Sequence, residues 1–247
     1  MVENCHLYSL PDGAKGFDTD RVVTDQVLAA AKAKQFTYIG RYVPRATPHD
    51  YDLSLAEAKR ILDAGFGLFL IQHVALPGWV PTAVLGTSYG ATAAAAATAL
   101  NLPPGISLVL DLEGVKPRTP AADTIAYAND WHSIVAAHGP LPAIYLGWRS
   151  GLSGSDAYRT LRFTHYIAAY NLDGSAYPII RGVQMQQKLQ IKLGGILVDP
   201  QVATADQLGG RFVVLRRDDG LSLAPRRKAG AARRGTKRRK SSPSLSK

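Results

Sequence analysis

The stretch ISLVLDLE at residues 106–113 decides the fold class of this 247-residue chain. Its alternation-free run of aliphatic residues predicts a strand that is buried on both faces, and the strand closes with two carboxylates. A second continuous apolar run, GLFLIQHVAL at residues 67–76, has the same character. Strands of this kind are typical of a parallel sheet covered by helices.

Shorter β-rich runs alternate with helical patterns on either side of these two strands. We count eight strands and about five helices, which predicts a parallel sheet. The strands are expected at 14–19, 36–43, 67–76, 106–113, 143–148, 163–170, 182–187 and 196–202. The helices are expected at 22–34, 54–65, 88–101, 119–138 and 155–161.

Eight strands close naturally into a barrel, so the predicted fold is α/β, a single (β/α)8-type TIM barrel. The last strands have little helical pattern between them, and the barrel should be irregular there. A doubly wound open sheet is the alternative. The second helix carries the clearest start signal: Ser54 as N-cap, Glu57 three residues later as its capping-box partner, and Gly65 as the stop.

The charge of the chain is concentrated at its end. The net charge is +10, but residues 221–247 contain ten of the 29 Lys and Arg residues and no Asp or Glu, so the rest is balanced at 19 of each sign. This end also lacks aromatic residues, and we expect it to be disordered. The predicted organisation is a barrel domain at 1–219 and a basic tail at 220–247.

Several function classes are disfavoured by composition. The single cysteine, Cys5, excludes an internal disulfide. The N-terminal sequence lacks the basic start and following apolar run that mark a signal peptide. We therefore expect the protein in the cytoplasm or exported by a non-classical route. The apolar stretch 91–100 is too short to span a membrane. The six histidines lack metal-ligand spacing, and we expect no cofactor and no metal.

Four carboxylates stand where predicted strands end: Asp18, Asp111, Glu113 and Asp199. Active sites of barrels form at the carboxyl ends of the strands, and the first and eighth strands are neighbours once the barrel closes. We therefore expect the four groups to meet. Crowding and burial raise the pKa of at least one carboxyl, which can protonate a leaving oxygen while an ionised neighbour stabilises positive charge. The structural alternative is that these acids cap helices or pair with arginines.

Aromatic and amide side chains also recur near strand ends, a mixture that suits a carbohydrate because rings stack on sugars and amides bond hydroxyls. They are Tyr42, Gln72, His73, Tyr145, Trp148, Tyr166, Tyr170, Gln184 and Gln186. Arg41 is a further candidate that either faces the site or forms a structural salt bridge. Barrel packing is the alternative for each of the others.

The order and spacing of several strings resemble a known family. They are GFDT (16–19), FTYIGRYV (36–43), SLAEAKRILDAGFGLFLI (54–71), LVLDLE (108–113), PAIYLGW (142–148), YIAAY (166–170), VQMQQ (183–187) and ILVDPQ (196–201). Together they resemble the glycoside-hydrolase-like bacterial domain of unknown function, a relative of the family 25 lysozymes or Chalaropsis-type muramidases. The resemblance covers roughly residues 14–203, and the departures at Tyr166, 183–185 and 198–201 spare the carboxylates.

The resemblance implies a barrel that cleaves β-1,4 bonds of peptidoglycan or a related amino-sugar polymer. It implies Glu113 as general acid, Asp111 as its partner carboxylate, and Asp18 and Asp199 as flanking acids that hold the sugar. Tyr145 would line the floor of the site.

Two alternatives remain at this stage. One is an inactive carbohydrate-binding barrel that its tail tethers to polyanions, and the other is a nucleic-acid-associated protein that uses the barrel as a scaffold. The tail at 221–247 is expected to contact polyanions or nucleic acid only nonspecifically. We expect a monomer.

Overall fold

The computed structural model describes residues 4–171 and 182–218. The predicted tail, and the predicted domain boundary at residue 219, lie outside the described residues. Within them, every strand and helix expected from the sequence is present, with shifted ends.

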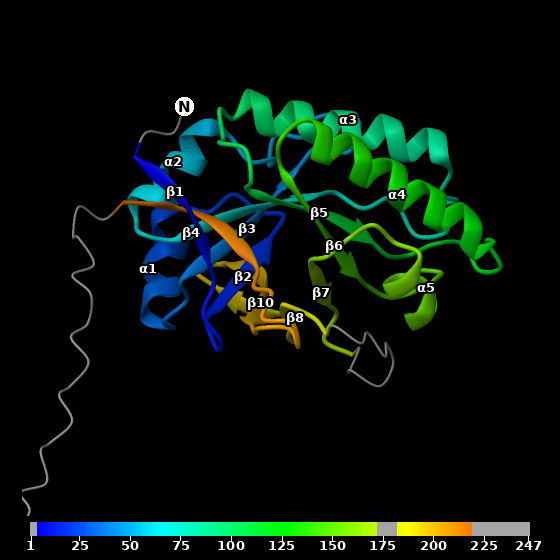
Figure 1. Cartoon of the computed structure of the whole chain (residues 1–247). Coiled ribbons are helices and arrows are strands. Elements are labelled where there is room, and N and C mark those ends of the chain that lie inside the picture. The colour runs from blue at the N-terminus through cyan, green and yellow to red at the C-terminus, as the bar shows by residue number, and fades with distance from the viewer. Residues whose placement is uncertain (1–3, 172–181, 219–247) are drawn as a thin grey trace, which may run out of the picture.

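Eight strands form a closed barrel (Figure 1). Going round it, the order is β2, β3, β4, β5, β6, β7, β8 and β10, and β10 pairs with β2 to close the ring. These strands are β2 (Lys15–Thr19), β3 (Tyr38–Val43), β4 (Gly67–Gln72), β5 (Ser107–Leu112), β6 (Leu141–Leu146), β7 (Tyr166–Ala168), β8 (Met185–Gln187) and β10 (Ile196–Ala203). The open-sheet alternative is therefore wrong.

The last strand of the barrel differs from the expectation of an all-parallel sheet. β2 to β8 pair in parallel, whereas β10 is antiparallel to both of its neighbours, β8 and β2. The eight residues between β8 and β10 hold only the short strand β9 (Ile191–Leu193), which forms a hairpin with β10. A parallel crossover needs a dozen or more residues, so the chain has to turn back on itself here.

A second antiparallel pair joins the chain ends and was not expected from the sequence. β1 (Cys5–Ser9) pairs with β11 (Val213–Arg217), and Leu215 of β11 pairs with Leu68 at the start of β4. β1 is half polar and largely exposed, so its sequence CHLYS has no clear strand pattern. Only its distant partner makes it a strand.

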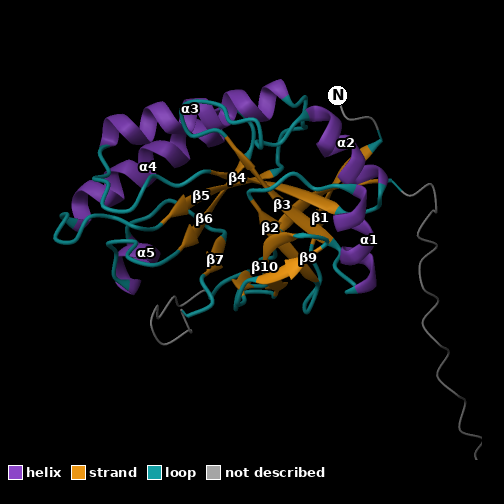
Figure 2. Cartoon of the chain, turned by 180° about the vertical axis from the view of Figure 1, so that it is seen from behind, coloured by secondary structure: helices purple, strands orange, loops and turns teal. Residues whose placement is uncertain are grey.

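Helices cover the outside of the barrel (Figure 2). They are α1 (Asp25–Ala33), α2 (Leu55–Asp63), α3 (Ala83–Ala99), α4 (Ala121–Ala137) and α5 (Gly154–Arg159). α3 begins five residues earlier than expected because the Thr82 side chain caps it by accepting from the Leu85 amide. α3 and α4 lie side by side, and a Cβ on Gly86 would overlap the Tyr127 carbonyl oxygen, so this close contact requires glycine.

Strand alternation separates two cores. Side chains that point outward, such as Leu108, Leu110 and Ile144, pack against the helices. Side chains that point inward, such as Phe69, Val109 and Met185, fill the barrel interior. Leu10, Phe212 and Val214 belong to the inner group and close the end where the parallel strands begin. The interior is thus apolar at that end, which leaves room for polar groups at the other.

Arg41 and Glu57 form a buried ion pair outside the barrel, and both differ from expectation. Ser54 caps α2 as expected, but the Glu57 carboxylate does not complete a capping box. It accepts from Arg41 Nε at 2.7 Å and from the Val23 amide at 2.7 Å. The guanidinium of Arg41 also donates to the carbonyls of Thr19 and Tyr51. Arg41 alternates with the inward-facing Tyr42 and so points away from the barrel interior.

We expect Arg41→Met to lower the free energy of unfolding by about 3–5 kcal/mol, because it leaves the Glu57 carboxylate buried without its counter-charge. The double variant Arg41→Met/Glu57→Leu should recover much of this loss. The measurement is urea denaturation followed by circular dichroism. Arg60→Met, which removes a half-exposed arginine on α2, should cost about 1 kcal/mol or less. A loss for Arg41→Met as small as this control would contradict the prediction.

Candidate functional site

The barrel brings the four predicted carboxylates to one cavity. Asp199 was expected at a strand end but lies in the middle of β10, and it reaches the cavity because antiparallel pairing sets it opposite Asp18. Asp18 on β2 and Asp199 on β10 are directly paired across the closing seam. Asp111 lies near the end of β5 and Glu113 follows that strand, two residues on and on the same side. All four line the cavity at the end of the barrel that the apolar core leaves open. Their meeting follows from closure between β2 and β10.

The cavity has a narrow inner part of about 90 Å³ and a wider mouth of about 330 Å³. The two parts share the four carboxylates and Tyr42. The inner part is further lined by Ile71, Val109, Tyr145, Ile167, Gln187 and Gln201, and the mouth by Thr19, Asp20, Arg21, His73, Val74, Gln190 and Leu197. Apolar and aromatic groups form the floor of the cavity, and the acids surround it above. This arrangement suits a polar ligand that contains cyclic units.

Asp18 is held by two side chains. Gln201 Nε2 donates to its Oδ2, and the Tyr42 hydroxyl donates to its Oδ1 at 3.4 Å. Burial raises the pKa of Asp18 well above its usual range, and the charge of Asp199 adds to this, while the bond from Tyr42 opposes it. Asp18 therefore keeps its proton to higher pH than an exposed aspartate does.

Asp111 has one carboxyl oxygen without a partner. It is only 6 % exposed, and its Oδ1 is buried with no hydrogen bond from the part of the chain that the structure describes. Burial raises the pKa of Asp111 well above its usual range, and the nearby Glu113 raises it further. An unpaired buried oxygen that faces a cavity is costly unless a ligand satisfies it.

Glu113 is placed by its backbone rather than by side-chain partners. Trp79 Nε1 donates to the Glu113 carbonyl at 2.9 Å, and the following Gly114 amide donates to the carbonyl of Trp148. A Cβ on Gly147 would overlap the Glu113 carboxylate, so glycine is required there to leave it room. Burial raises the pKa of Glu113, a hydrogen bond from the Trp148 backbone lowers it, and the charge of Asp199 raises it.

Asp199 and Tyr145 complete the cavity. Burial also raises the pKa of Asp199, but this carboxyl is partly open to solvent, and its Oδ1 accepts from Gln190 Nε2 at 3.4 Å, which lowers the pKa. The Tyr145 hydroxyl donates to Gln187 Oε1 at 2.6 Å and lies on the floor, where we expected it.

Five candidates for sugar binding are held elsewhere and do not line the cavity. Gln72 bonds the Tyr89 carbonyl and Trp131, and the Tyr166 hydroxyl donates to the carbonyls of Ala157 and Phe163. Arg41 forms the outer ion pair with Glu57. Its position therefore supports the structural salt bridge and not a role in sugar binding. Gln184 is fully buried, accepts from the Tyr166 amide at 2.6 Å and donates to Asp206. Gln186 accepts from Lys188 Nζ at 2.8 Å. On β8 the inward positions are Met185 and Gln187, so the expectation was off by one residue.

Two exposed aromatic candidates lie outside the lining as well. Trp148 is 50 % exposed, and the Arg149 guanidinium covers its ring at 4.3 Å from the centroid. The Trp148 backbone bonds the Glu113 region, but its side chain lines neither part of the cavity. Tyr170 is 55 % exposed and is absent from the lining.

Sequence reasoning missed Gln187 and Gln201 as lining residues, and it named Tyr42 only among the strand-end aromatics. Strand alternation could have found Gln201, because it is two residues from Asp199 on the same strand and therefore shares its side. The same rule applies to Gln187 only once the side of Met185 is known.

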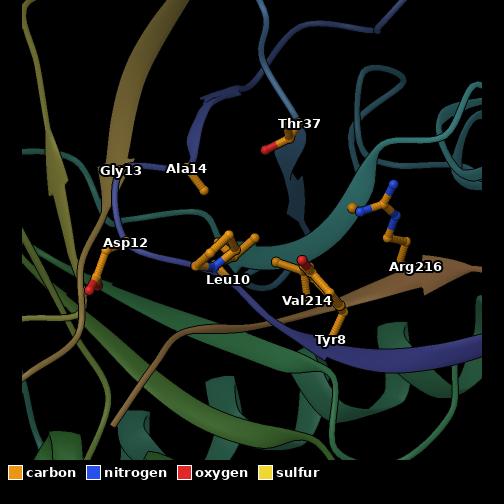
Figure 3. A pocket seen from close by; sticks show the side chains of 10 residues that line it. Tyr8, Leu10, Asp12, Gly13, Ala14, Thr37, Val214 and Arg216 are labelled. Carbon is orange, nitrogen blue, oxygen red and sulfur yellow. The ribbon is translucent and has the colours of Figure 1, made fainter. Parts of the chain in front are cut away.

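A second cavity, of about 300 Å³, lies at the opposite end of the barrel (Figure 3). Leu10 and Val214 line it between Asp12 and Arg216. Its polar groups already have partners: the Thr37 hydroxyl donates to the Lys15 carbonyl, Asp12 pairs with Arg211, and Arg216 lies over the Tyr8 ring. It therefore has less to offer a ligand than the acidic cavity.

Within residues 4–171 and 182–218, no three or more His, Cys, Asp or Glu side chains are arranged so that they could hold a metal ion. Over the same residues, none of the helices has the length and apolar character needed to cross a bilayer.

Solved structures of other proteins share this fold. An uncharacterized B. stearothermophilus protein is 19% identical, with a TM-score of 0.58, over 78% of this chain and 96% of that one. A bacterial lysozyme from Streptomyces coelicolor is 15% identical, with a TM-score of 0.51, over 79% and 94%. A family 25 glycosyl hydrolase from Bacillus anthracis is 13% identical, with a TM-score of 0.52, over 80% and 91%.

At these identities the structural likeness shows the fold alone. No curated protein sequence matches the chain. A family model for the "Rv2525c-like, glycoside hydrolase-like domain" matches residues 29–188, which include β3 to β8 and both Asp111 and Glu113. Because this match spans well over half of the chain, the protein belongs to the Rv2525c-like family of glycoside hydrolase-like domains.

Proposed function

We propose that the protein is a glycoside hydrolase that cleaves β-1,4 bonds of peptidoglycan or a related amino-sugar polymer. The observation that carries this proposal is the gathering of Asp18, Asp111, Glu113 and Asp199 round one cavity, where burial raises the pKa of each. Glycoside hydrolysis needs a pair of carboxyl groups of which one is protonated and the other ionised. The fold shared with a lysozyme and a family 25 glycosyl hydrolase supports the choice of substrate class.

The electrostatics favour Glu113 as the acid. It lies at the mouth, where a glycosidic oxygen can reach it, and burial and the Asp199 charge both raise its pKa. Asp199 is more open than Asp18 or Asp111 and is the better candidate for the ionised partner. The deep burial of Asp111 argues against the partner role that the family resemblance implied for it. Asp111 and Asp18, in their neutral forms, are suited to hold sugar hydroxyl or amide groups.

The reaction then has two proton steps. Glu113 gives its proton to the glycosidic oxygen as the bond from that oxygen to the anomeric carbon breaks, and ionised Asp199 stabilises the positive charge that develops on the sugar ring. Water then adds to the anomeric carbon and returns a proton to Glu113. Tyr145 on the floor offers a ring face for the sugar.

The first prediction concerns the acid. Glu113→Gln should lower kcat for release of reducing ends from purified peptidoglycan by about 10²–10⁴-fold, because the amide cannot donate the proton. The melting temperature should stay the same or rise. Asp123→Asn, which changes an exposed carboxylate on α4, is the control and should keep full activity.

Full turnover by Glu113→Gln would contradict the assignment. Saturable binding of peptidoglycan by the unaltered protein without any product would instead favour the inactive carbohydrate-binding domain.

The second prediction concerns pH. Activity should fall at high pH as Glu113 loses its proton and at low pH as Asp199 gains one. In Asp199→Asn the negative charge that raises the pKa of Glu113 is removed, so the Glu113 carboxyl should titrate at lower pH than in the unaltered protein, as followed by NMR. A Glu113 pKa that is the same in both proteins would contradict this coupling.

The third prediction concerns stability and needs no substrate. The pKa of the Asp111 carboxyl is higher in the folded protein than in the unfolded chain. The stability that this carboxyl contributes is therefore complete below the unfolded pKa and is lost as pH rises through the folded pKa. Asp111→Asn should therefore stabilise the protein at neutral pH, by about 0.5–2 kcal/mol, and make its stability less dependent on pH. Denaturation curves at several pH values measure this. Lower stability at neutral pH, with an unchanged pH slope, would contradict it.

A further inference from the structure

An aromatic wall adjoins the cavity mouth, which two of its members, Tyr42 and His73, line. It consists of Tyr42, His49, Tyr51 and His73. The rings of His49 and Tyr51 stack with centroids 4.9 Å apart and an interplanar angle of 7°. The His73 ring meets both of them edge-on, at 5.5 and 5.7 Å. Its centroid is 4.9 Å from that of Tyr42, which lines the cavity. The wall therefore runs from the loop after β3 into the cavity.

Asp52 fixes this wall. Its Oδ1 accepts from His73 Nε2 at 2.7 Å, and its Oδ2 accepts from the His49 amide at 2.7 Å. The Asp52 carboxylate is 8 % exposed and the His73 side chain 17 %. The His73 amide in turn donates to the carbonyl of Val43, the last residue of β3. One carboxylate thus holds both the imidazole and the loop that carries the other rings.

The hydrogen bond to Asp52 sets the chemistry that His73 can offer. Burial lowers the pKa of His73, and the bond to Asp52 and its charge oppose this only in part. The neutral ring donates through Nε2, so its Nδ1 is an acceptor. Among the residues that the structure describes, the bond to Asp52 is the only hydrogen bond of the His73 side chain. Nδ1 is therefore available to an N–H or O–H group of a ligand.

His73 lies beside the carboxylates and not among them. It lines the wide mouth with Glu113 and Asp199 but is absent from the narrow inner part. It comes directly after β4, on the same side as the inward-facing Phe69 and Ile71. A polymer whose reacting sugar lies over the carboxylates would have its next unit in this wide mouth.

We propose that the aromatic wall is a saccharide subsite that binds the sugar unit next to the reacting one. His73 Nδ1 accepts a hydrogen bond from an amide N–H or hydroxyl of that unit, and Asp52 positions the imidazole for it. Tyr42 supplies apolar ring surface to the same sugar, and His49 and Tyr51 support the His73 ring from behind. This inference rests on the proposed function, because it takes the reacting unit to lie over the four acids.

The experiment uses the full chain carrying Glu113→Gln, so that an oligosaccharide is bound without being cleaved. Binding of a soluble peptidoglycan tetrasaccharide and of the matching disaccharide is measured by calorimetry. His73→Ala is added to this background, and so is His73→Phe, which keeps the ring but removes the acceptor. His138→Ala is the matched control, because His138 ends α4 near the start of β6, at the far end of the barrel. The imidazole NMR signals of His73 and His138 are followed in the same titrations.

We expect His73→Ala and His73→Phe to weaken tetrasaccharide binding by about 3–10-fold, the effect of one net hydrogen bond. Disaccharide binding should change by less than about twofold by the same measure. The His73 imidazole signals should shift with the tetrasaccharide, and those of His138 should not.

Each of the other possible results contradicts a specific part of the proposal. Tetrasaccharide binding that is the same with and without His73 would refute the subsite while leaving the proposed function intact. An equal loss for both sugars would place His73 at the reacting unit and refute the neighbouring position. No binding of either sugar, with no turnover by the unaltered protein, would refute the proposed function and the subsite together.

Discussion

Closure of the barrel between β2 and the antiparallel β10 is the constraint on which the acidic cavity depends. It sets Asp18 directly opposite Asp199, residues that are far apart in the sequence. The same closure brings Gln201 to the Asp18 carboxyl, where its amide supplies one of the few donors available to a buried acid. Without this seam, the acids of β5 would face only their own strand neighbours. The electrostatic pattern of the cavity is therefore a product of topology, and no local motif contains it.

The barrel interior combines two demands that oppose each other. Phe69, Phe212 and their neighbours pack one end and supply the burial that stabilises the fold. At the other end the same walls bury carboxyl groups, which costs free energy unless protons neutralise them. The raised pKa values of Asp18 and Asp111 express that cost. Sites that need shifted pKa values commonly carry such a local loss of stability, which the rest of the fold offsets.

The layer between the barrel and its helices stabilises buried charges in a different way from the cavity. Arg41 and Glu57 are as buried as Asp18 and Asp111, but each satisfies the other, and backbone carbonyls and an amide take up the remaining bonds. This network also ties the segment after Asp18 to α2, so it supports the site from behind without reaching it. Alternation along β3 is what separates the two environments: Tyr42 faces the cavity, and Arg41, one residue earlier, faces the helices.

The sequence by itself predicted eight strands, five helices and the four acids, because buried parallel strands are written as continuous apolar runs, and Asp18, Asp111 and Glu113 lie near the ends of such strands or directly after them. It left an open sheet as the alternative to a closed barrel. It could not assign the sides of short strands: Gln184 and Gln186 were chosen where Gln187 lines the cavity, since β8 has only three residues and no alternation of its own. Nor could it show β1, whose strand pairing comes from β11 at the other end of the chain. The tertiary structure alone decided the reversed direction of β10, the partner of Arg41 and the ring contacts of His73. These depend on which distant residues meet, and local propensity carries no information about that.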